Sequence, residues 1–139
     1  MKQVSVFAEN RRGTMQAITQ VLYDERINIL GSVTNDSGEY GIVRLIVSDP
    51  QKAHHALNEA GYQTRLTDVI GVEVEDREGN MNQLLKALSD SYINVDYIYL
   101  SFNRKTCRPI LIFKTEEYQE VINCLETKGF TVVEDDFYQ

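Results

Sequence analysis

The feature that most restricts the fold of this chain is an internal repeat, in which an early segment matches a later one without a gap. When the sequence is shifted by 66 positions, residues 6–29 align with residues 72–95, and nine of these 24 positions are identical. Average composition predicts about one or two identities. The identical pairs are Val6/Val72, Glu9/Glu75, Arg11/Arg77, Gly13/Gly79, Met15/Met81, Leu22/Leu88, Asp24/Asp90, Ile27/Ile93 and Asn28/Asn94. The chain is therefore expected to contain two copies of one structural unit.

Beyond residue 29 the two copies differ by a short insertion. A shift of 68 then places Leu57 on Leu125 and Gly61 on Gly129. The first copy has a compact turn signal at residues 35–38, whereas the matching segment, residues 103–108, is longer and lacks glycine. Because hairpin tips tolerate insertions, the two extra residues are predicted to lie in a hairpin.

Each copy predicts the same order of strands and helices. Strands are predicted at residues 2–9, 27–34, 42–47 and 62–66, and again at 70–76, 93–102, 110–113 and 130–133. Amphipathic helices are predicted at 14–25 and 80–91, and a second helix in each copy is expected to end before Gly61 or Gly129, which suit left-handed backbone. The order βαββαβ is the ferredoxin-like plan of the α+β class, an antiparallel sheet with helices on one face. We expect two tandem domains, residues 1–68 and 69–139.

Composition and charge argue against several functional classes. A net charge of −7 over 139 residues does not favour nucleic acid or an anionic membrane as partner. No apolar run approaches the length of a membrane span and no signal-peptide pattern precedes the first strand, so a cytoplasmic protein is expected. Cys107 and Cys124 lack the CxxC spacing and are expected to be reduced thiols. No catalytic triad, metal-ligand set or cofactor motif is present, so we predict no catalytic residue, metal or cofactor.

The most informative segment is the first turn from strand to helix, Glu9 to Met15, which recurs as Glu75 to Met81. Backbone N–H groups at a helix start attract a carboxylate, and glycine lets the backbone approach a ligand closely. A side-chain amide or carboxylate just before the glycine accepts hydrogen bonds from an ammonium group, so the turn suits a zwitterion. The alternative is that polar side chains of these turns only cap the helices. The residues concerned are Asn10, Thr14, Asp76 and Asn80.

The turn Glu9-Asn10-Arg11-Arg12-Gly13, together with Ile27-Asn28-Ile29 at the start of the next strand, resembles the ACT domain family. It is most similar to the serine-responsive regulatory domain of bacterial 3-phosphoglycerate dehydrogenases. The resemblance implies that an amino acid lies between the turn of one unit and the second strand of its neighbour. Arg12 replaces the family's usual proline. Ala8 and Val74 replace the histidine that contacts serine, which leaves room for a larger side chain.

The resemblance assigns the turn role to Asn10 and Asp76 and the strand role to Asn28 and Asn94. We predict an intrachain pseudo-dimer in which the turn of each copy meets the second strand of the other. The first turn has one acid and two arginines, the second three acids and one arginine, so the first should hold a carboxylate better. The predicted ligand-binding residues are Asn10, Arg11, Arg12, Gly13, Thr14, Met15, Asn28, Asp76, Gly79, Asn80, Met81 and Asn94.

The resemblance favours a non-catalytic amino-acid sensor that regulates a partner enzyme of amino-acid metabolism. We also expect a homodimer, because an exposed second strand invites pairing between sheet edges. One alternative is a ligand-free adaptor that acts on its partner by protein–protein contact. Another is a small enzyme that uses Asp76 or Asp96 as a base.

Overall fold

The structure, a computed structural model, describes residues 1–36 and 38–134. The first half of the chain contains β1 (Lys2–Glu9), α1 (Thr14–Asp24), β2 (Ile29–Asp36), β3 (Tyr40–Val47), α2 (Pro50–Glu59) and β4 (Gln63–Asp68). The second half contains β5 (Ile70–Glu73), α3 (Asn80–Asp90), β6 (Tyr97–Phe102), β7 (Pro109–Lys114), α4 (Tyr118–Thr127) and β8 (Thr131–Val132). The predicted order βαββαβ is confirmed in both copies.

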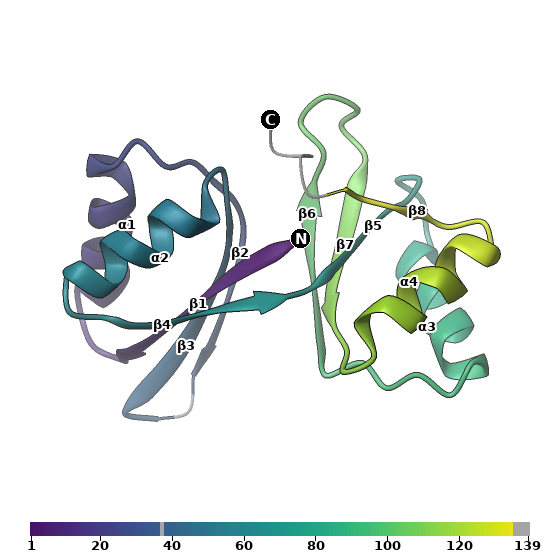
Figure 1. Cartoon of the computed structure of the whole chain (residues 1–139), viewed down its shortest axis with the longest axis horizontal. Coiled ribbons are helices and arrows are strands. Elements are labelled where there is room, and N and C mark those ends of the chain that lie inside the picture. The colour runs from purple at the N-terminus through teal and green to yellow at the C-terminus, as the bar shows by residue number, and fades with distance from the viewer. Residues whose placement is uncertain (37, 135–139) are drawn as a thin grey trace. The chain divides into compact units, whose positions relative to one another are not determined.

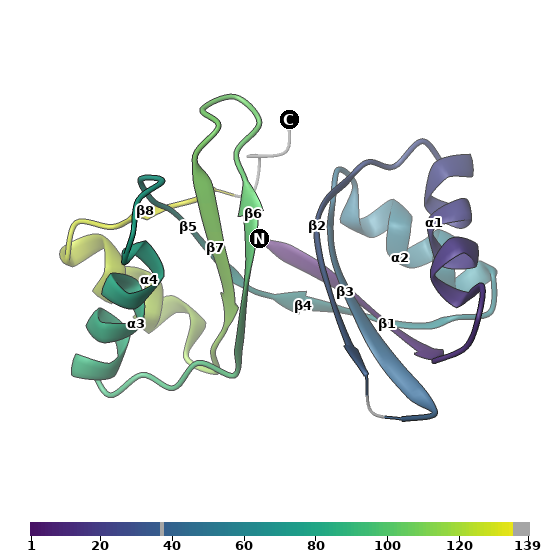
Figure 2. The same cartoon turned by 180° about the vertical axis from the view of Figure 1, so that it is seen from behind.

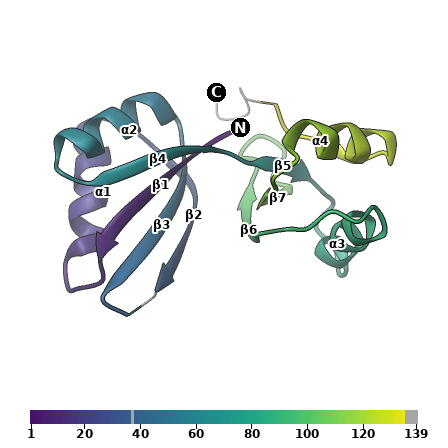
Figure 3. The same ribbon diagram turned by 60° about the horizontal axis from the view of Figure 1, so that its bottom comes forward.

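The chain divides into two compact units. The first unit runs from Lys2 to Thr67, and the second begins at Asp68 and also includes Met1. The first unit has a sheet of order β2-β3-β1-β4 and the second a sheet of order β6-β7-β5-β8. In each unit both helices cover one face of the sheet (Figures 1, 2 and 3). Residues 135–139 of the predicted second domain lie outside the part of the chain that the structure describes.

Strand register confirms the repeat and locates the insertion. Val4 lies opposite Leu45 in the first sheet, and Ile70 lies opposite Phe113 in the second. The two pairs are related by the shifts of 66 and 68 read from the sequence. Asp36 and Phe102, which end equivalent strands, differ by 66, so the two extra residues lie in the hairpin between β6 and β7, as predicted.

Each unit packs its own hydrophobic core between the helices and the sheet. The cores contain the helix stripes predicted from the sequence, represented by Ile18, Leu22 and Leu57 in the first unit and by Leu84 and Leu88 in the second. Burying side chains of this size contributes about 1.5–3 kcal/mol each. The helix face of each sheet completes its core, with Val4, Val6, Val43, Leu45 and Val47 in the first unit and Ile70, Val72, Leu111 and Phe113 in the second.

The second helix of each unit ends as predicted, at a glycine with left-handed backbone. Gly61 has φ +94° and Gly129 has φ +89°. Beyond α2, Tyr62 N–H donates to Leu57 O at 3.0 Å and Gly61 N–H donates to Asn58 O at 3.0 Å. This pair of bonds satisfies the last carbonyls of the helix and turns the chain back towards the sheet. It places Gly61 and Tyr62 near the start of α1, where the candidate site lies.

The structure shortens two predicted strands of the second unit. The prediction of strand over residues 93–102 is wrong for its first four residues, because β6 begins at Tyr97. Tyr92 has φ +59°, and Ile93 N–H donates to Leu88 O, so this stretch completes the end of α3. The prediction over residues 70–76 is likewise too long, because β5 ends at Glu73 and the turn towards α3 follows.

Candidate functional site

The turn between β1 and α1 has the backbone that the sequence predicts for a ligand-binding turn. Gly13 precedes α1 with φ +87°, and a Cβ atom added there would meet nothing within 4 Å. The glycine is thus required by backbone conformation and not by lack of space. No side chain caps α1 in the described part of the chain. The alternative that Asn10 or Thr14 caps this helix is therefore wrong. The N–H groups of the first turn carry the positive end of the helix dipole and are not covered by a capping side chain from the described residues.

Asn10 has a different role, which is to join the turn to the tip of the β2–β3 hairpin. Its side-chain amide donates to Asp36 Oδ1 at 2.8 Å and to Gly38 O at 3.3 Å. Its backbone N–H donates to Glu39 O at 2.8 Å. The turn and the hairpin therefore form one hydrogen-bonded assembly within the first unit.

A pocket of about 550 Å³ opens beside the turn of the first unit. This volume lies within the range of about 300–1,000 Å³ that small-molecule sites occupy. Its lining residues are Phe7, Ala8, Glu9, Arg11, Arg12, Gly13, Thr14, Ala17, Tyr40, Gly61, Tyr62 and Gln63. The lining thus combines charged groups of the turn with the aromatic rings of Phe7, Tyr40 and Tyr62. That combination suits a ligand with an ionic head and an apolar side chain.

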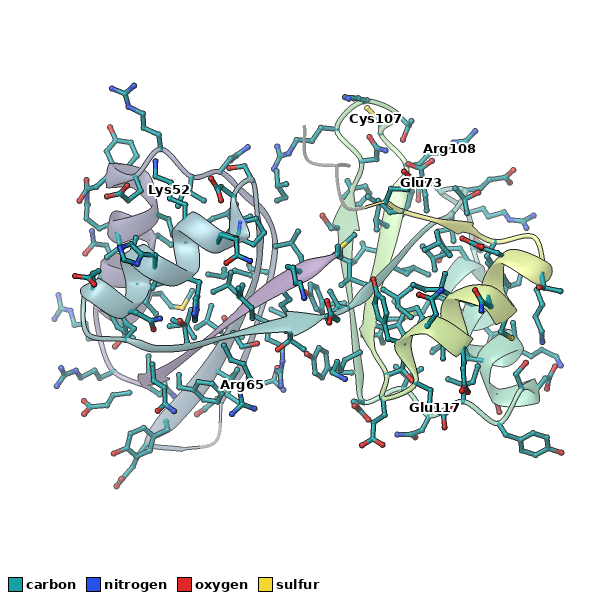
Figure 4. The ribbon with its side chains drawn as sticks, in the orientation of Figure 1. Lys52, Arg65, Glu73, Cys107, Arg108 and Glu117 are labelled. Carbon is teal, nitrogen blue, oxygen red and sulfur yellow. The ribbon has the colours of Figure 1, made fainter. Side chains whose placement is uncertain are left out.

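The two arginines that line this pocket differ in whether a protein group pairs with their charge. Arg11 Nη1 lies 3.1 Å from Glu9 Oε2, and both side chains are mostly exposed, so the pair is weak and easily rearranged. Among the described residues Arg12 has neither an ion pair nor a side-chain hydrogen bond. The guanidinium of Arg65, which projects from β4 (Figure 4), lies 6.0 Å from the ring centroid of Phe7. In the described part of the chain, Arg12 is therefore the cation of this pocket without a protein partner, which leaves it available to an anion.

The second unit has a pocket of about 310 Å³ at the equivalent place. Its lining residues are Glu73, Val74, Glu75, Arg77, Asn80, Gln83, Arg108, Lys128, Gly129, Phe130 and Thr131. Shifts of 66 and 68 relate most of them to lining residues of the first pocket, for example Thr14 to Asn80 and Tyr62 to Phe130. The repeat has thus kept the position of the pocket and changed its chemistry.

The turn of the second unit also differs from that of the first in its hydrogen bonds. Asn80 Oδ1 accepts from Met81 N–H at 2.6 Å, and its amide donates to Glu75 O at 3.1 Å. The side chain of Asn80 therefore engages the backbone N–H of the next residue, although no side chain caps α3 in the described part of the chain. Gly79 has φ +83° and Asp76 is exposed.

Five of the twelve predicted ligand-binding residues line the two pockets, and five more belong to the same turns. Arg11, Arg12, Gly13 and Thr14 line the first pocket, and Asn80 lines the second. Asn10, Met15, Asp76, Gly79 and Met81 belong to the same turns but line neither pocket.

The strand asparagines lie elsewhere in their own units. Asn28 N–H donates to Ser48 Oγ at 2.9 Å, and Asn94 Nδ2 donates to Asp96 Oδ1 at 3.2 Å. Asn94 lines a pocket of about 250 Å³ with three acidic side chains, Asp96, Glu116 and Glu117. The assignment of Asn28 and Asn94 to a ligand stays a prediction.

Reasoning from the sequence missed the aromatic and apolar wall of the first pocket. Phe7 lies on β1 before the turn, Tyr40 begins β3, and Tyr62 follows the glycine after α2. These residues are far apart in the sequence, and only the strand order β3-β1-β4 brings them together. The sequence offers a partial signal for this wall, because Gly61, which it predicts to end the second helix, directly precedes Tyr62.

Two other features, a metal site and a membrane-spanning helix, are not found among the described residues. These residues contain no group of three or more His, Cys, Asp or Glu side chains that could hold a metal ion. None of the helices in the described part is long and apolar enough to cross a membrane. Cys107 and Cys124 are free thiols.

Comparison with known families gives one match over nearly the whole chain. A family model described as an ACT domain pair matches residues 1–138. No curated protein matches the chain.

Comparison with solved structures agrees in fold. Protein BT0572 from Bacteroides thetaiotaomicron is similar with a TM-score of 0.90 and 29% identity, over 99% of this chain and 95% of that one. The ligand-free regulatory subunit of aspartate kinase from Thermus thermophilus has a TM-score of 0.68 and 16% identity, over 91% of each chain. The corresponding subunit from Thermus flavus has a TM-score of 0.64 and 16% identity, over 91% of this chain and 90% of that one.

Proposed function

Because the chain belongs to the family of ACT domain pairs, we propose that it is a non-catalytic regulatory protein whose first unit binds a free amino acid at the β1–α1 turn. The observation that carries this proposal is the pocket beside that turn, which is lined by Arg12, by the start of α1 and by aromatic side chains. The predicted set Asn10, Arg11, Arg12, Gly13, Thr14 and Met15 supplies or shapes the polar side of the site. The remaining predicted residues lie outside this turn. Asp76, Gly79, Asn80 and Met81 belong to the turn of the second copy, and Asn28 and Asn94 were predicted from the second strands.

Each part of an amino acid has a partner in this pocket. The ligand carboxylate accepts hydrogen bonds from Arg12 and from first-turn N–H groups of α1. The ligand ammonium lies against the carboxylate of Glu9, whose exposed pair with Arg11 is weak. The ligand side chain packs against Tyr40 and Tyr62, which line the same pocket. This arrangement favours amino acids with apolar or aromatic side chains over serine.

A signal leaves the pocket through the hairpin that Asn10 holds. A ligand that repositions the turn also moves Asp36 and Gly38, because Asn10 bonds to both. The ligand shifts the population of hairpin positions only as far as it binds one position better than another. We propose that a partner enzyme of amino-acid metabolism reads this difference. The aspartate kinase regulatory subunits are similar in fold and are described as regulatory.

A thermal-shift screen of the twenty amino acids tests the proposal. A ligand that binds only the native protein raises the melting temperature, by an amount that grows with its concentration over Kd. We expect one chemical class, apolar or aromatic, to raise it and serine to raise it less. If all twenty leave the melting temperature unchanged while the protein still binds a partner, the adaptor alternative is correct. The enzyme alternative receives no support from Asp76 and Asp96, whose side chains are exposed.

We further infer that the protein is a homodimer that pairs through β6, the edge strand of the second sheet. Leu100 is 44% exposed and Phe102 is 49% exposed, on a strand that carries no charged residue and keeps unbroken register with β7. The equivalent positions on β2 are Thr34 and Asp36, and that strand has a register shift near Gly31. Charges and bulges are the devices that protect an edge from pairing, and β6 has neither. An antiparallel pair of two β6 strands also brings no like charges together.

Replacement of Leu100 by lysine is expected to convert the dimer to a monomer, because it places a charge on the pairing strand of both copies. Sedimentation equilibrium measures the change in mass. The matched control is Thr34→Lys at the equivalent position of β2, which should stay dimeric. A monomeric wild-type protein, or equal effects of the two substitutions, would show that β6 is not the interface.

A further inference from the structure

The two equivalent pockets differ in charge, because the repeat replaces Phe7 by the acid Glu73 and other aromatic or apolar side chains by cations. Tyr40 of the first pocket corresponds to Arg108 in the second, by the shift of 68. The residue before the left-handed glycine changes in the same sense, from Ala60 to Lys128. Ala17 corresponds to Gln83, which adds a hydrogen-bonding amide. These changes act together, because Arg108, Lys128 and Gln83 all line one pocket.

The cations of the second pocket are only partly compensated by protein groups. Arg77 lies 3.7 Å from Glu75, and its Nη2 donates to Gln83 Oε1 at 3.2 Å. Within the described residues, the acceptor of Lys128 Nζ is a carbonyl, Ala87 O, at 3.2 Å. Arg108 has no ion pair and no side-chain hydrogen bond among the residues that the structure describes. Counting residues 1–36 and 38–134, two of the three cations that line the pocket therefore have no carboxylate partner.

The remaining acid of the pocket, Glu73, is already engaged by the β6–β7 hairpin. Its Oε1 accepts from Asn103 Nδ2 at 2.7 Å and from Thr106 Oγ1 at 3.1 Å. Figure 4 shows Glu73 and Arg108 at the end of the second unit that carries this hairpin. The two hydrogen bonds hold the carboxylate towards the hairpin, and Arg108 is left available for an exogenous anion.

From this cluster we propose that the second unit binds a phosphate group. A phosphate offers several acceptor oxygens, which match the guanidinium groups of Arg77 and Arg108 and the ammonium group of Lys128. Gln83 and Asn80 supply further polar atoms at the rim. A volume of about 310 Å³ also accommodates the small organic part of a phosphate monoester. The inference concerns residues of the second unit only and stands whether or not the first pocket binds an amino acid.

Titration of the whole chain with inorganic phosphate tests this site, at constant ionic strength adjusted with chloride. Isothermal titration calorimetry of the wild-type protein is expected to give one saturable phosphate site. Arg108→Tyr, which installs the residue of the first copy, is expected to weaken binding about tenfold or more, since a charged hydrogen bond is lost. Lys128→Ala, which likewise restores the first-copy residue, should weaken binding in the same direction. Both side chains are exposed, so the melting temperature in chloride should change little.

Two controls separate a phosphate site from general charge screening. Lys105→Ala removes a positive charge from the same hairpin outside the pocket and should change phosphate affinity less than about twofold. Arg12→Ala removes the free cation of the first pocket and should leave phosphate affinity unchanged. The proposal is overturned if wild type shows no saturable phosphate binding, or if Lys105→Ala weakens it as much as Arg108→Tyr. It is also overturned if acetate binds as tightly as phosphate, or if Arg12→Ala abolishes phosphate binding.

Discussion

Replacing Phe113 by alanine is expected to lower the free energy of unfolding by about 3–5 kcal/mol. Phe113 lies on β7 and is fully buried, with 0% of its surface exposed. It belongs to the core of the second unit, opposite Ile70 on β5. Truncation removes the transfer free energy of the ring and leaves a cavity that a strand flanked by two others cannot close. Urea denaturation followed by circular dichroism measures the loss.

The repeat supplies a second test of the same prediction. Leu45 occupies the equivalent position in the first unit and is also fully buried, so Leu45→Ala should lower the free energy of unfolding by about 2–5 kcal/mol. Tyr23→Ala is the control, because Tyr23 is 77% exposed and its loss should change stability by less than about 0.5 kcal/mol. A loss below about 1 kcal/mol for Phe113→Ala would place this residue outside a packed core.

The largest expected effect on ligand binding comes from reversing the charge of Arg12. Arg12→Glu removes the cation that is free to receive the ligand carboxylate and places a like charge beside it. Loss of one charged hydrogen bond corresponds to about 1.5–3 kcal/mol, and repulsion adds to it, so affinity should fall about a hundredfold or more. Isothermal titration with the amino acid selected by the thermal-shift screen measures the change.

The matched control for this reversal is Arg26→Glu. Arg26 is an exposed arginine of the first unit that does not line the pocket, and the substitution changes net charge by the same amount. We expect its affinity to differ from wild type by less than about threefold, which is the size of a screened long-range effect. Equal weakening by the two substitutions would mean that overall charge, and not the position of Arg12, determines binding.

The fold could be predicted from the sequence because the repeat constrained every element twice. Alternation in Val4 and Val6 and helical spacing in Ile18 and Leu22 each recur 66 positions later, so an error in one copy conflicts with the other. The sequence predicts the end of β5 and the start of β6 less accurately than the other boundaries. The residues after Asp90 are apolar enough for a strand, yet the end of α3 uses Tyr92 in a left-handed conformation that side chains of this size seldom adopt.

The candidate site could be predicted only in part, for a physical reason. The turn residues are contiguous, and a glycine before a helix gives a local signal that the sequence displays directly. The aromatic wall depends on strand order, which brings Tyr40 and Tyr62 to the same end of β1 from distant positions. The role of Asn10 could not be predicted either, because its hydrogen bond to Asp36 joins the turn to a distant hairpin whose register is set by side-chain packing.

Amide NMR of the whole chain during titration with the selected amino acid tests most directly whether the β1–α1 turn of the first unit holds the ligand. Binding there should produce saturable shifts that are largest for the N–H groups of residues 9–16, with smaller shifts at residues 61–63 and in the hairpin that Asn10 holds. A saturable ligand whose shifts leave residues 9–16 unmoved would contradict the proposed site.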